Sequence, residues 1–248
     1  NFNLPTFSHT PLILNSEGKK LSKRDCVTSI DEFREMGYLP EALSNYMAFL
    51  GWSPKSAERE ILSLEEISEI FELSEINKAG AKFSWEKLNW INSQHIKNME
   101  TIKLSEIMMK YWNDNGWVPP SQEWGYKLAI LLRDSMTLLK DSIDQSKPFF
   151  LIPTIQKEGQ DFLKSDDSKL SLKLILNYLI EHHTIKLNKE KAKEIINEIS
   201  KMHNIKKGIL MKSLRVAFFG SLSGPDLIQS WELFAESKSD RTRIERCI

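Results

Sequence analysis

Apolar residues recur every three or four positions along most of the chain, as they do on the buried face of an α-helix. This rhythm is clearest in five stretches: Trp85–Ile91, Leu104–Trp112, Leu128–Leu139, Leu172–Leu179 and Ala192–Met202. Alternation of apolar and polar residues, which is typical of strands, is nearly absent except at Leu12–Leu14. We therefore predict a mainly α protein with ten or more helices, arranged as a multi-domain helical array.

Capping residues mark the ends of several predicted helices. Ser29–Glu32 and Ser63–Glu66 have the capping-box pattern, in which a serine and a glutamate three residues later bond each other's backbone N–H groups. Further helix starts are predicted at Pro40, Ser84 and Asp166–Ser168, and helix ends at Gly37 and Gly51.

Two breaks divide the helical pattern into parts. Gly116–Pro120 interrupts it, and Pro148–Gly159 contains two prolines without a clear period. A length of 248 residues is too great for one ordinary core. We place boundaries near residues 24, 100 and 150, which predicts four parts: 1–24, 25–100, 101–150 and 151–248.

Composition and charge narrow the function classes. With 41% hydrophobic and 27% charged residues, the chain resembles a folded globular protein, and no run approaches the roughly 20 apolar residues of a membrane span. The 34 basic residues balance the 34 acidic ones in number. Bases nevertheless outnumber acids in residues 1–24 and 167–219, while residues 56–76 are acidic. This layout fits contact with a polyanion at two places, and the alternative is a set of solvated helix faces.

The segment Gly18–Arg24 is the sharpest local feature. It places three lysines, a serine and an arginine within six positions after a flexible glycine. Ammonium groups can neutralise phosphate oxygens while the hydroxyl and backbone N–H groups donate hydrogen bonds, so the segment can close over a polyphosphate. An exposed basic turn is the alternative.

Several motifs, taken in order, resemble the glutamyl-tRNA synthetases. Class I synthetases share a signature loop with the sequence Lys-Met-Ser-Lys-Ser. Lys20–Arg24 is similar to the form that this loop takes in the glutamyl-tRNA synthetases. The other matching blocks are Pro11–Leu14, Gly37–Tyr46, Leu50–Ser53, Lys82–Asn92, Leu214–Gly220 and Gly224–Leu227. The resemblance runs from about residue 4 to the end and is weakest between residues 93 and 210.

The resemblance implies an ATP-dependent glutamate–tRNA ligase. Lys20, Leu21, Ser22, Lys23 and Arg24 would contact ATP, with Lys23 in the catalytic role and Mg²⁺ accompanying the nucleotide. No His-x-Gly-His segment occurs in the chain, so the N-terminal Rossmann-type domain is expected to be missing. We therefore expect a C-terminal portion that does not activate glutamate alone. No metal ligand set is expected among its residues.

The resemblance also assigns RNA contacts. Residues 1–24 would end the catalytic domain, 25–100 would contact the tRNA stem, and 101–150 and 151–248 would bind the anticodon. Arg215, Gly224, Pro225 and Leu227 match positions that read anticodon bases, and the alternative for Arg215 is pairing with a nearby acid. In residues 25–100, seven apolar side chains are expected to form core rather than stack on RNA: Tyr46, Phe49, Trp52, Phe71, Trp85, Leu88 and Trp90.

One position bears on specificity. Leu131–Lys140 aligns with the helix that faces the third anticodon base, and Ser135 stands where strict family members have an arginine. A short serine leaves room for cytosine or guanine, which predicts a non-discriminating enzyme that acts on both tRNA(Glu) and tRNA(Gln). The alternative is that Arg133 discriminates, from a position turned about 200° around that helix.

Two other functions remain open from the sequence. The chain could be a stand-alone, non-catalytic RNA-binding module, or a helical protein-interaction scaffold. A glutaminyl enzyme shares the signature loop, but its anticodon region is a β-barrel and this chain lacks such a strand pattern. We expect a cytoplasmic monomer without a membrane segment.

Overall fold

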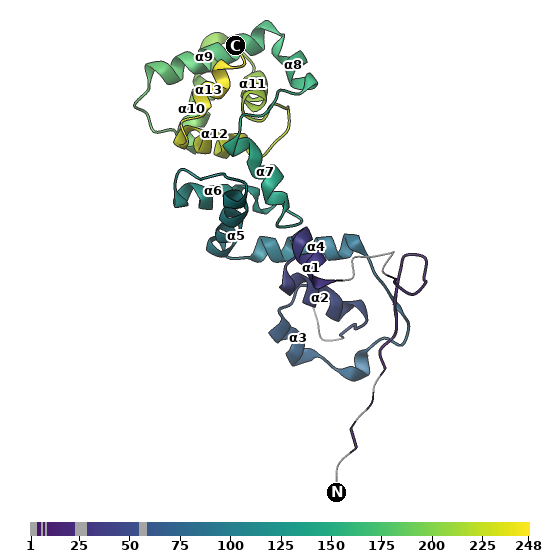
Figure 1. Ribbon diagram of the computed structural model, residues 1–248. Coiled ribbons are helices and arrows are strands. Elements are labelled where there is room, and N and C mark those ends of the chain that lie inside the picture. The colour runs from purple at the N-terminus through teal and green to yellow at the C-terminus, as the bar shows by residue number, and fades with distance from the viewer. Residues whose placement is uncertain (1–3, 6, 8, 23–28, 55–58) are drawn as a thin grey trace. The chain divides into compact units, whose positions relative to one another are not determined.

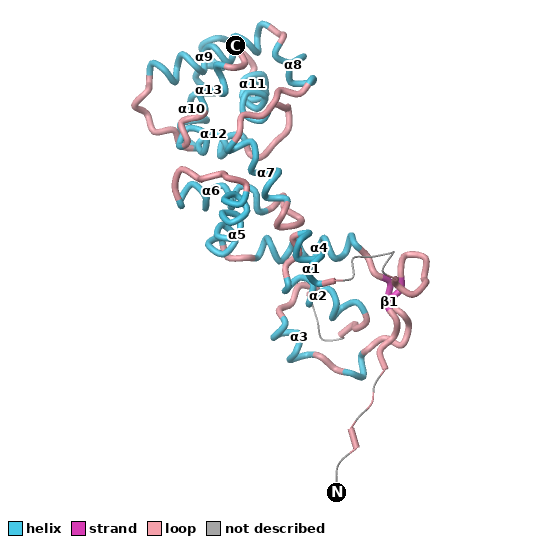
Figure 2. The backbone as a smooth tube through the Cα atoms, viewed as in Figure 1, coloured by secondary structure: helices cyan, strands magenta, loops and turns pink. Residues whose placement is uncertain are grey.

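Helices dominate the computed structural model, which describes residues 4–5, 7, 9–22, 29–54 and 59–248 (Figure 1). Among these residues there are thirteen α-helices and two short strands, and strand is a minor element of the backbone (Figure 2). The predicted mainly α fold is confirmed, and a short strand is present at Ile13–Leu14. The chain forms two compact units, residues 1–100 with 134–141, and residues 101–133 with 142–248.

The first unit combines helices with a small parallel sheet, in which Ile13 pairs with Ala81 and Leu14 with Lys82. Its elements are β1 (Ile13–Leu14), α1 (Ile30–Met36), α2 (Pro40–Leu50), α3 (Leu64–Ile70), the 3-10 helix η1 (Leu73–Glu75), β2 (Ala81–Lys82) and α4 (Trp85–Asn98).

The predicted caps of this unit are confirmed. Ser29 and Ser63 each accept a bond from the backbone of the glutamate three residues later, which completes both capping boxes. Gly37 ends α1 in the left-handed conformation, with φ 96°, and Pro40 is the first residue of α2. These local signals place helix ends independently of tertiary contacts, because each satisfies backbone groups that a helix leaves without partners.

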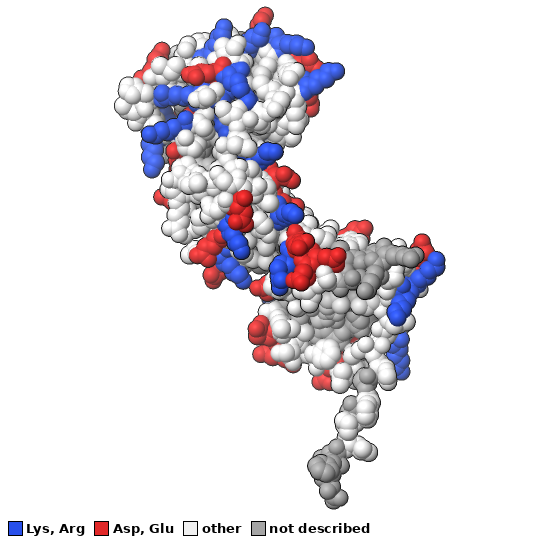
Figure 3. Space-filling view, viewed as in Figure 1, with Lys and Arg blue, Asp and Glu red and all other residues white. Residues whose placement is uncertain are grey.

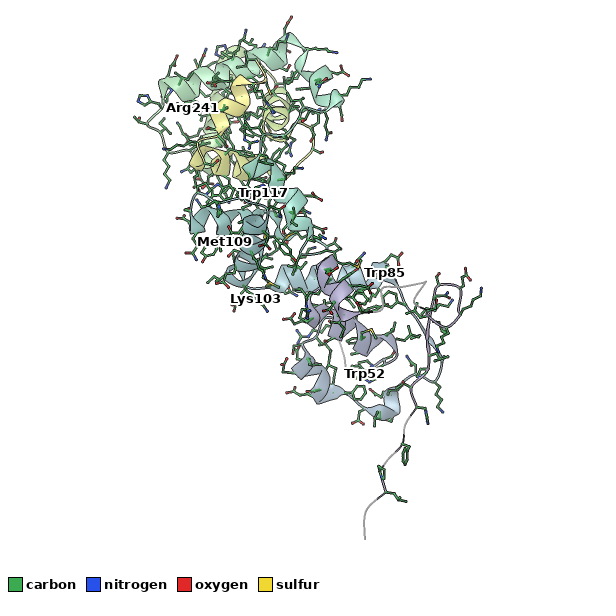
Figure 4. The ribbon with its side chains drawn as sticks, in the orientation of Figure 1. Trp52, Trp85, Lys103, Met109, Trp117 and Arg241 are labelled. Carbon is green, nitrogen blue, oxygen red and sulfur yellow. The ribbon has the colours of Figure 1, made fainter. Side chains whose placement is uncertain are left out.

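Part of the core of the first unit lies beside α2 and α3, where Trp52, labelled in Figure 4, packs with Leu62 and Ile67. Of the seven residues expected in the core, Tyr46, Trp52 and Leu88 are buried, and Phe49 and Trp85 are half-buried.

Phe71 and Trp90 correct the core prediction, since each side chain is 42% exposed. Phe71 follows the last turn of α3. Its ring packs against that of Trp52, with the two centroids 5.3 Å apart. The ring of Trp90 is covered on one face by the Lys87 ammonium, 4.3 Å from its centroid.

The regular elements of the second unit are all helices among the described residues. Its helices are α5 (Thr101–Asp114), α6 (Gln122–Arg133), α7 (Asp141–Phe150), α8 (Lys157–Leu163), α9 (Asp166–Glu181), α10 (Lys189–His203), α11 (Lys207–Phe219), α12 (Leu227–Glu236) and α13 (Asp240–Glu245).

Aromatic residues from both halves of this unit form one core. The rings of Phe149 and Phe234 stack with centroids 4.9 Å apart, and the indole N–H of Trp124 donates to the Leu233 carbonyl at 2.9 Å. Residues 101–150 and 151–248 therefore share a core, although the proline-rich break at Pro148–Gly159 suggested separate parts.

Two helix ends differ from the predictions. The apolar rhythm of Leu128–Leu139 predicted one helix, but α6 ends at Arg133 and the chain then forms turns that belong to the first unit. Helix α9 is capped by Ser165, one residue before the predicted Asp166–Ser168, because the Ser165 side chain accepts from Ser168 N–H. Within the described part of the chain, no helix is both long and apolar enough to cross a membrane.

Candidate functional site

The basic segment Gly18–Arg24 follows β1 and begins in a tight turn. Asn15 Oδ1 accepts bonds from the N–H groups of Glu17 at 3.1 Å and Lys19 at 3.0 Å. Gly18 has φ 80°, a conformation that side chains disfavour, so glycine suits this turn. The Lys19 ammonium pairs with Glu17 at 2.8 Å on the surface, which makes it a poor candidate for binding phosphate.

The predicted ATP-contacting residues follow this turn. Lys20 forms an antiparallel bridge with Leu14, and Leu21 N–H donates to the Ile13 carbonyl at 2.9 Å. Lys20 and Ser22 are exposed. The structure thus fixes the first half of the loop and presents an ammonium and a hydroxyl at the surface.

Lys23 and Arg24, the remaining predicted loop residues, lie outside the described residues. Their roles stay predictions.

A cavity of about 510 Å³ lies beside the turn, and sequence reasoning missed it. The first turn of α4 contributes Glu86 to its lining. The backbone N–H of Glu86 itself and the Ser84 hydroxyl lower the pKa of the Glu86 carboxyl. Lys20 is not among the lining residues, which are Asn15, Ser16, Glu17, Leu21, Lys82, Phe83, Ser84, Trp85 and Glu86. The cavity is therefore not a purely cationic phosphate pocket.

The second cluster of predicted residues lies where α11 leads to α12. Arg215 is half-buried on α11, and its Nη1 donates to the carbonyls of Gly224 at 2.7 Å and Pro225 at 3.0 Å. The structure thus brings together three of the residues that the sequence assigned to RNA. Among the described residues, Arg215 bonds to carbonyls rather than to the nearby acid that was the alternative.

Close packing determines the conformation of this connection. Gly224 has φ 154°, and a Cβ there would lie 2.9 Å from the Phe219 ring. Asp226 caps α12 by accepting from Gln229 N–H at 2.9 Å. Leu227 is only 1% exposed, so its side chain is part of the core. A base therefore cannot pack on the Leu227 side chain in this conformation, and the assignment of Leu227 to tRNA binding stays a prediction.

Ser135 lies in neither cluster. It is exposed in the turn that follows α6, within the segment 134–141 of the first unit. The expectation that Ser135 is helical is wrong. The rotation of about 200° between Ser135 and Arg133 assumed that both residues lie on one helix, so it does not apply. Arg133 is the last residue of α6, and its Nη2 donates to Thr101 Oγ1 at 2.6 Å.

Basic residues are numerous on the second unit. Figure 3 shows Lys and Arg predominating over Asp and Glu on its visible face. Exposed lysines of α9, α10, α11 and the connection before α10 are Lys169, Lys173, Lys186, Lys189, Lys193, Lys201, Lys207 and Lys212. Such a surface attracts a polyanion. Among the described residues, no group of three His, Cys, Asp or Glu side chains could hold a metal ion.

Comparisons with known proteins identify the family. Residues 100–248 match the family model of the anticodon binding domain, and residues 1–90 match that of the catalytic domain of class I tRNA synthetases (E and Q). The chain is 91% identical over 248 residues to a glutamate–tRNA ligase of Prochlorococcus marinus strain MIT 9301, and 50% identical to that of strain NATL2A. It spans about half the length of these relatives, 52% of each.

Solved structures agree with this assignment. A glutamate–tRNA ligase crystal structure from Elizabethkingia meningosepticum, in complex with its amino acid, matches 99% of the chain with TM-score 0.89 and 30% identity. A glutamate–tRNA synthetase from Elizabethkingia anophelis matches 100% with TM-score 0.86 and 31% identity. The chain covers 52% of each. It therefore belongs to the glutamate–tRNA ligase family of class I tRNA synthetases, with the family's anticodon-binding domain over residues 100–248.

Proposed function

We propose that this chain supplies the tRNA-binding part and the signature loop of a ligase that joins glutamate to tRNA using ATP. The observation that carries the proposal is the bonding of Arg215 to Gly224 and Pro225, since the family motifs assign all three residues to one RNA-reading site. On the resemblance alone, the complete ligase acts as a monomer in the cytoplasm.

Arg215 would read an anticodon base directly. Two bonds from Nη1 to backbone carbonyls orient the planar guanidinium. Among the described residues, this leaves Nε and Nη2 as donors toward a ligand, since the group carries five N–H donors in all. Unpaired bases expose acceptors on their edges that such a fork can bond. Pro225, which is half-buried, offers an apolar surface beside it.

The signature loop would act on ATP. Adenylation of glutamate expels pyrophosphate, which carries more negative charge in the transition state than in bound ATP. Lys23 would stabilise that charge, while Lys20, Ser22 and the backbone of Leu21 hold the loop near the phosphates. Mg²⁺ would accompany the nucleotide rather than bind to protein ligands of this chain.

Specificity for the third anticodon base would depend on Ser135. Its side chain is short, uncharged and exposed, so it excludes neither cytosine nor guanine. The complete ligase would therefore charge both tRNA(Glu) and tRNA(Gln), and the latter product would need amidation.

The anticodon proposal is tested by Arg215→Ala in the complete ligase. We expect tRNA affinity to fall by about 1–3 kcal/mol, the scale of a bidentate base contact, with a loss that depends on the anticodon base. Lys212→Ala is the matched control on the same helix, since an exposed lysine should weaken all anticodon variants alike and mainly at low salt. Uniform weakening by Arg215→Ala would remove the base-reading role.

The specificity proposal is tested by charging both tRNA species. The unaltered ligase should glutamylate tRNA(Glu) and tRNA(Gln), and Ser135→Arg should reduce charging of tRNA(Gln) selectively. A ligase that charges tRNA(Glu) alone before any substitution would refute the assignment to Ser135.

A further inference from the structure

We infer that Asn92 is a positioning residue that holds the segment 134–141, and with it Ser135, in place for tRNA. The inference rests on the proposed function, because that proposal gives this segment its role in reading the anticodon. The matching block Lys82–Asn92 ends at this residue but assigns it no role, and its tertiary contacts reveal one.

Asn92 connects three parts of the first unit through one side chain. It lies on α4 and is fully buried. Its Oδ1 accepts from Leu39 N–H, just before α2, at 2.9 Å, and its Nδ2 donates to the Thr137 carbonyl at 2.6 Å. Both polar atoms of the amide thus have a backbone partner.

The backbone of Gly37 holds the same segment from the end of α1. Its carbonyl accepts from Leu139 N–H at 2.9 Å. A Cβ at Gly37 would lie 2.7 Å from Lys140 N, and φ there is 96°, so both the close approach and the conformation need glycine. This contact fixes the far end of the segment against α1.

Asp141 completes the attachment by capping the turn. Its Oδ2 accepts from the N–H groups of Thr137 and Leu138, both at 2.8 Å. Met136 is 1% exposed, so its side chain anchors the segment in the core. Ser135, next to it, is exposed at the surface. The attached backbone therefore presents the short Ser135 side chain at a defined place.

Asparagine suits this position because its amide both donates and accepts. A carboxylate of the same shape at residue 92 would keep the bond from Leu39 but would face the Thr137 carbonyl without a donor. An unpaired buried carbonyl costs more than an average hydrogen bond gains. Asn92→Asp should therefore release the segment while leaving the α2 side of the contact intact.

The experiment measures kinetic constants of the complete ligase with Asn92→Asp. We expect KM for tRNA to rise about tenfold, the scale of roughly 1.4 kcal/mol, while KM for ATP stays unchanged. A merely structural role would lower the active fraction, and so kcat, with both KM values unchanged. That result would overturn the inference.

Two further variants keep the outcome decisive. Asn89→Asp is the matched control, since Asn89 lies one turn away on α4 and accepts from the Tyr38 hydroxyl, a bond that a carboxylate retains. It should leave KM for tRNA unchanged, and an equal rise would refute the inference. If Asn92→Asp does not fold, Asp141→Ala takes its place. Asp141 is half-buried and accepts from Thr137 N–H, so its loss loosens the same segment and should also raise KM for tRNA. An unchanged KM in that variant would also refute it.

A combined variant separates this inference from the proposed function. Ser135→Arg should make the ligase strict, and adding Asn92→Asp should abolish that strictness because the new arginine loses its placement. If Ser135→Arg gains no strictness, the proposed specificity fails. The KM values of Asn92→Asp still decide the positioning role, since they do not depend on which base the segment faces.

Discussion

Lys127 connects α6 to α12, and its removal should destabilise the second unit measurably. Its ammonium lies 2.6 Å from Glu236 Oε1 and 3.1 Å from Glu232 Oε1. The side chains of Glu232 and Glu236 are 16% and 22% exposed, and that of Lys127 is 32% exposed. Burial acts to lower the pKa of Lys127, but the bonds and charges of Glu236 and Glu232 outweigh it and raise that pKa above its ordinary value. The pairing therefore favours the folded unit.

The magnitude follows from the charges that Lys127→Met leaves behind. Two carboxylates that bond one ammonium lie about 5 Å apart, and at an effective dielectric constant of about 20 their repulsion is roughly 3 kcal/mol. Partial exposure screens this interaction, and the carboxylates can turn toward water. We therefore expect the unfolding free energy of the second unit to fall by about 1–2 kcal/mol.

The assay is urea unfolding followed by circular dichroism and tryptophan fluorescence. Lys110→Met is the control, because this exposed lysine on α5 should change stability by less than about 0.5 kcal/mol. Adding Glu236→Gln to Lys127→Met should recover part of the loss by removing the repulsion. Equal stability of the Lys127 and Lys110 variants, or no recovery with Glu236→Gln, would show that the attraction to the two glutamates is not what holds α6 to α12.

Three further outcomes are expected. Arg243 is 1% exposed and donates to the carbonyls of Phe218 and Leu151, so Arg243→Met should cost about 2–4 kcal/mol in urea unfolding; a loss below about 1 kcal/mol would contradict this. Burial lowers the pKa of His95, so the folded state disfavours the imidazolium. The free energy of unfolding should therefore be greatest above about pH 6.5 and should fall as the pH drops from there through the lowered pKa. His95→Gln should remove that part of the pH dependence between about pH 7.5 and 5.5. In the complete ligase, Lys23→Ala should slow ATP–pyrophosphate exchange by roughly 10²–10³ with tRNA binding retained, and an unaltered rate would refute its catalytic role.

Much of the secondary structure was predictable because its causes are local. The capping boxes at Ser29 and Ser63 satisfy backbone groups within a few residues, and Pro40 has the backbone geometry that a first turn requires. The apolar rhythm correctly predicted helices wherever a single face is buried. The assignment of Arg215, Gly224 and Pro225 to RNA came from family motifs. Periodicity could not reveal their contact, because a contact over nine or ten residues has no repeating signal.

The tertiary structure decided what depends on distant partners. The rhythm of Leu128–Leu139 continues past Arg133, yet α6 ends there, and the backbone of the following segment instead bonds to Asn92 and Gly37. Those partners are far away in sequence, 45 residues in the case of Asn92, so no local pattern could reveal them. The exposure of Ser135 and the burial of Leu227 are decided in the same way: periodicity tells which residues share a helix face, but only packing tells which faces meet and which meet water.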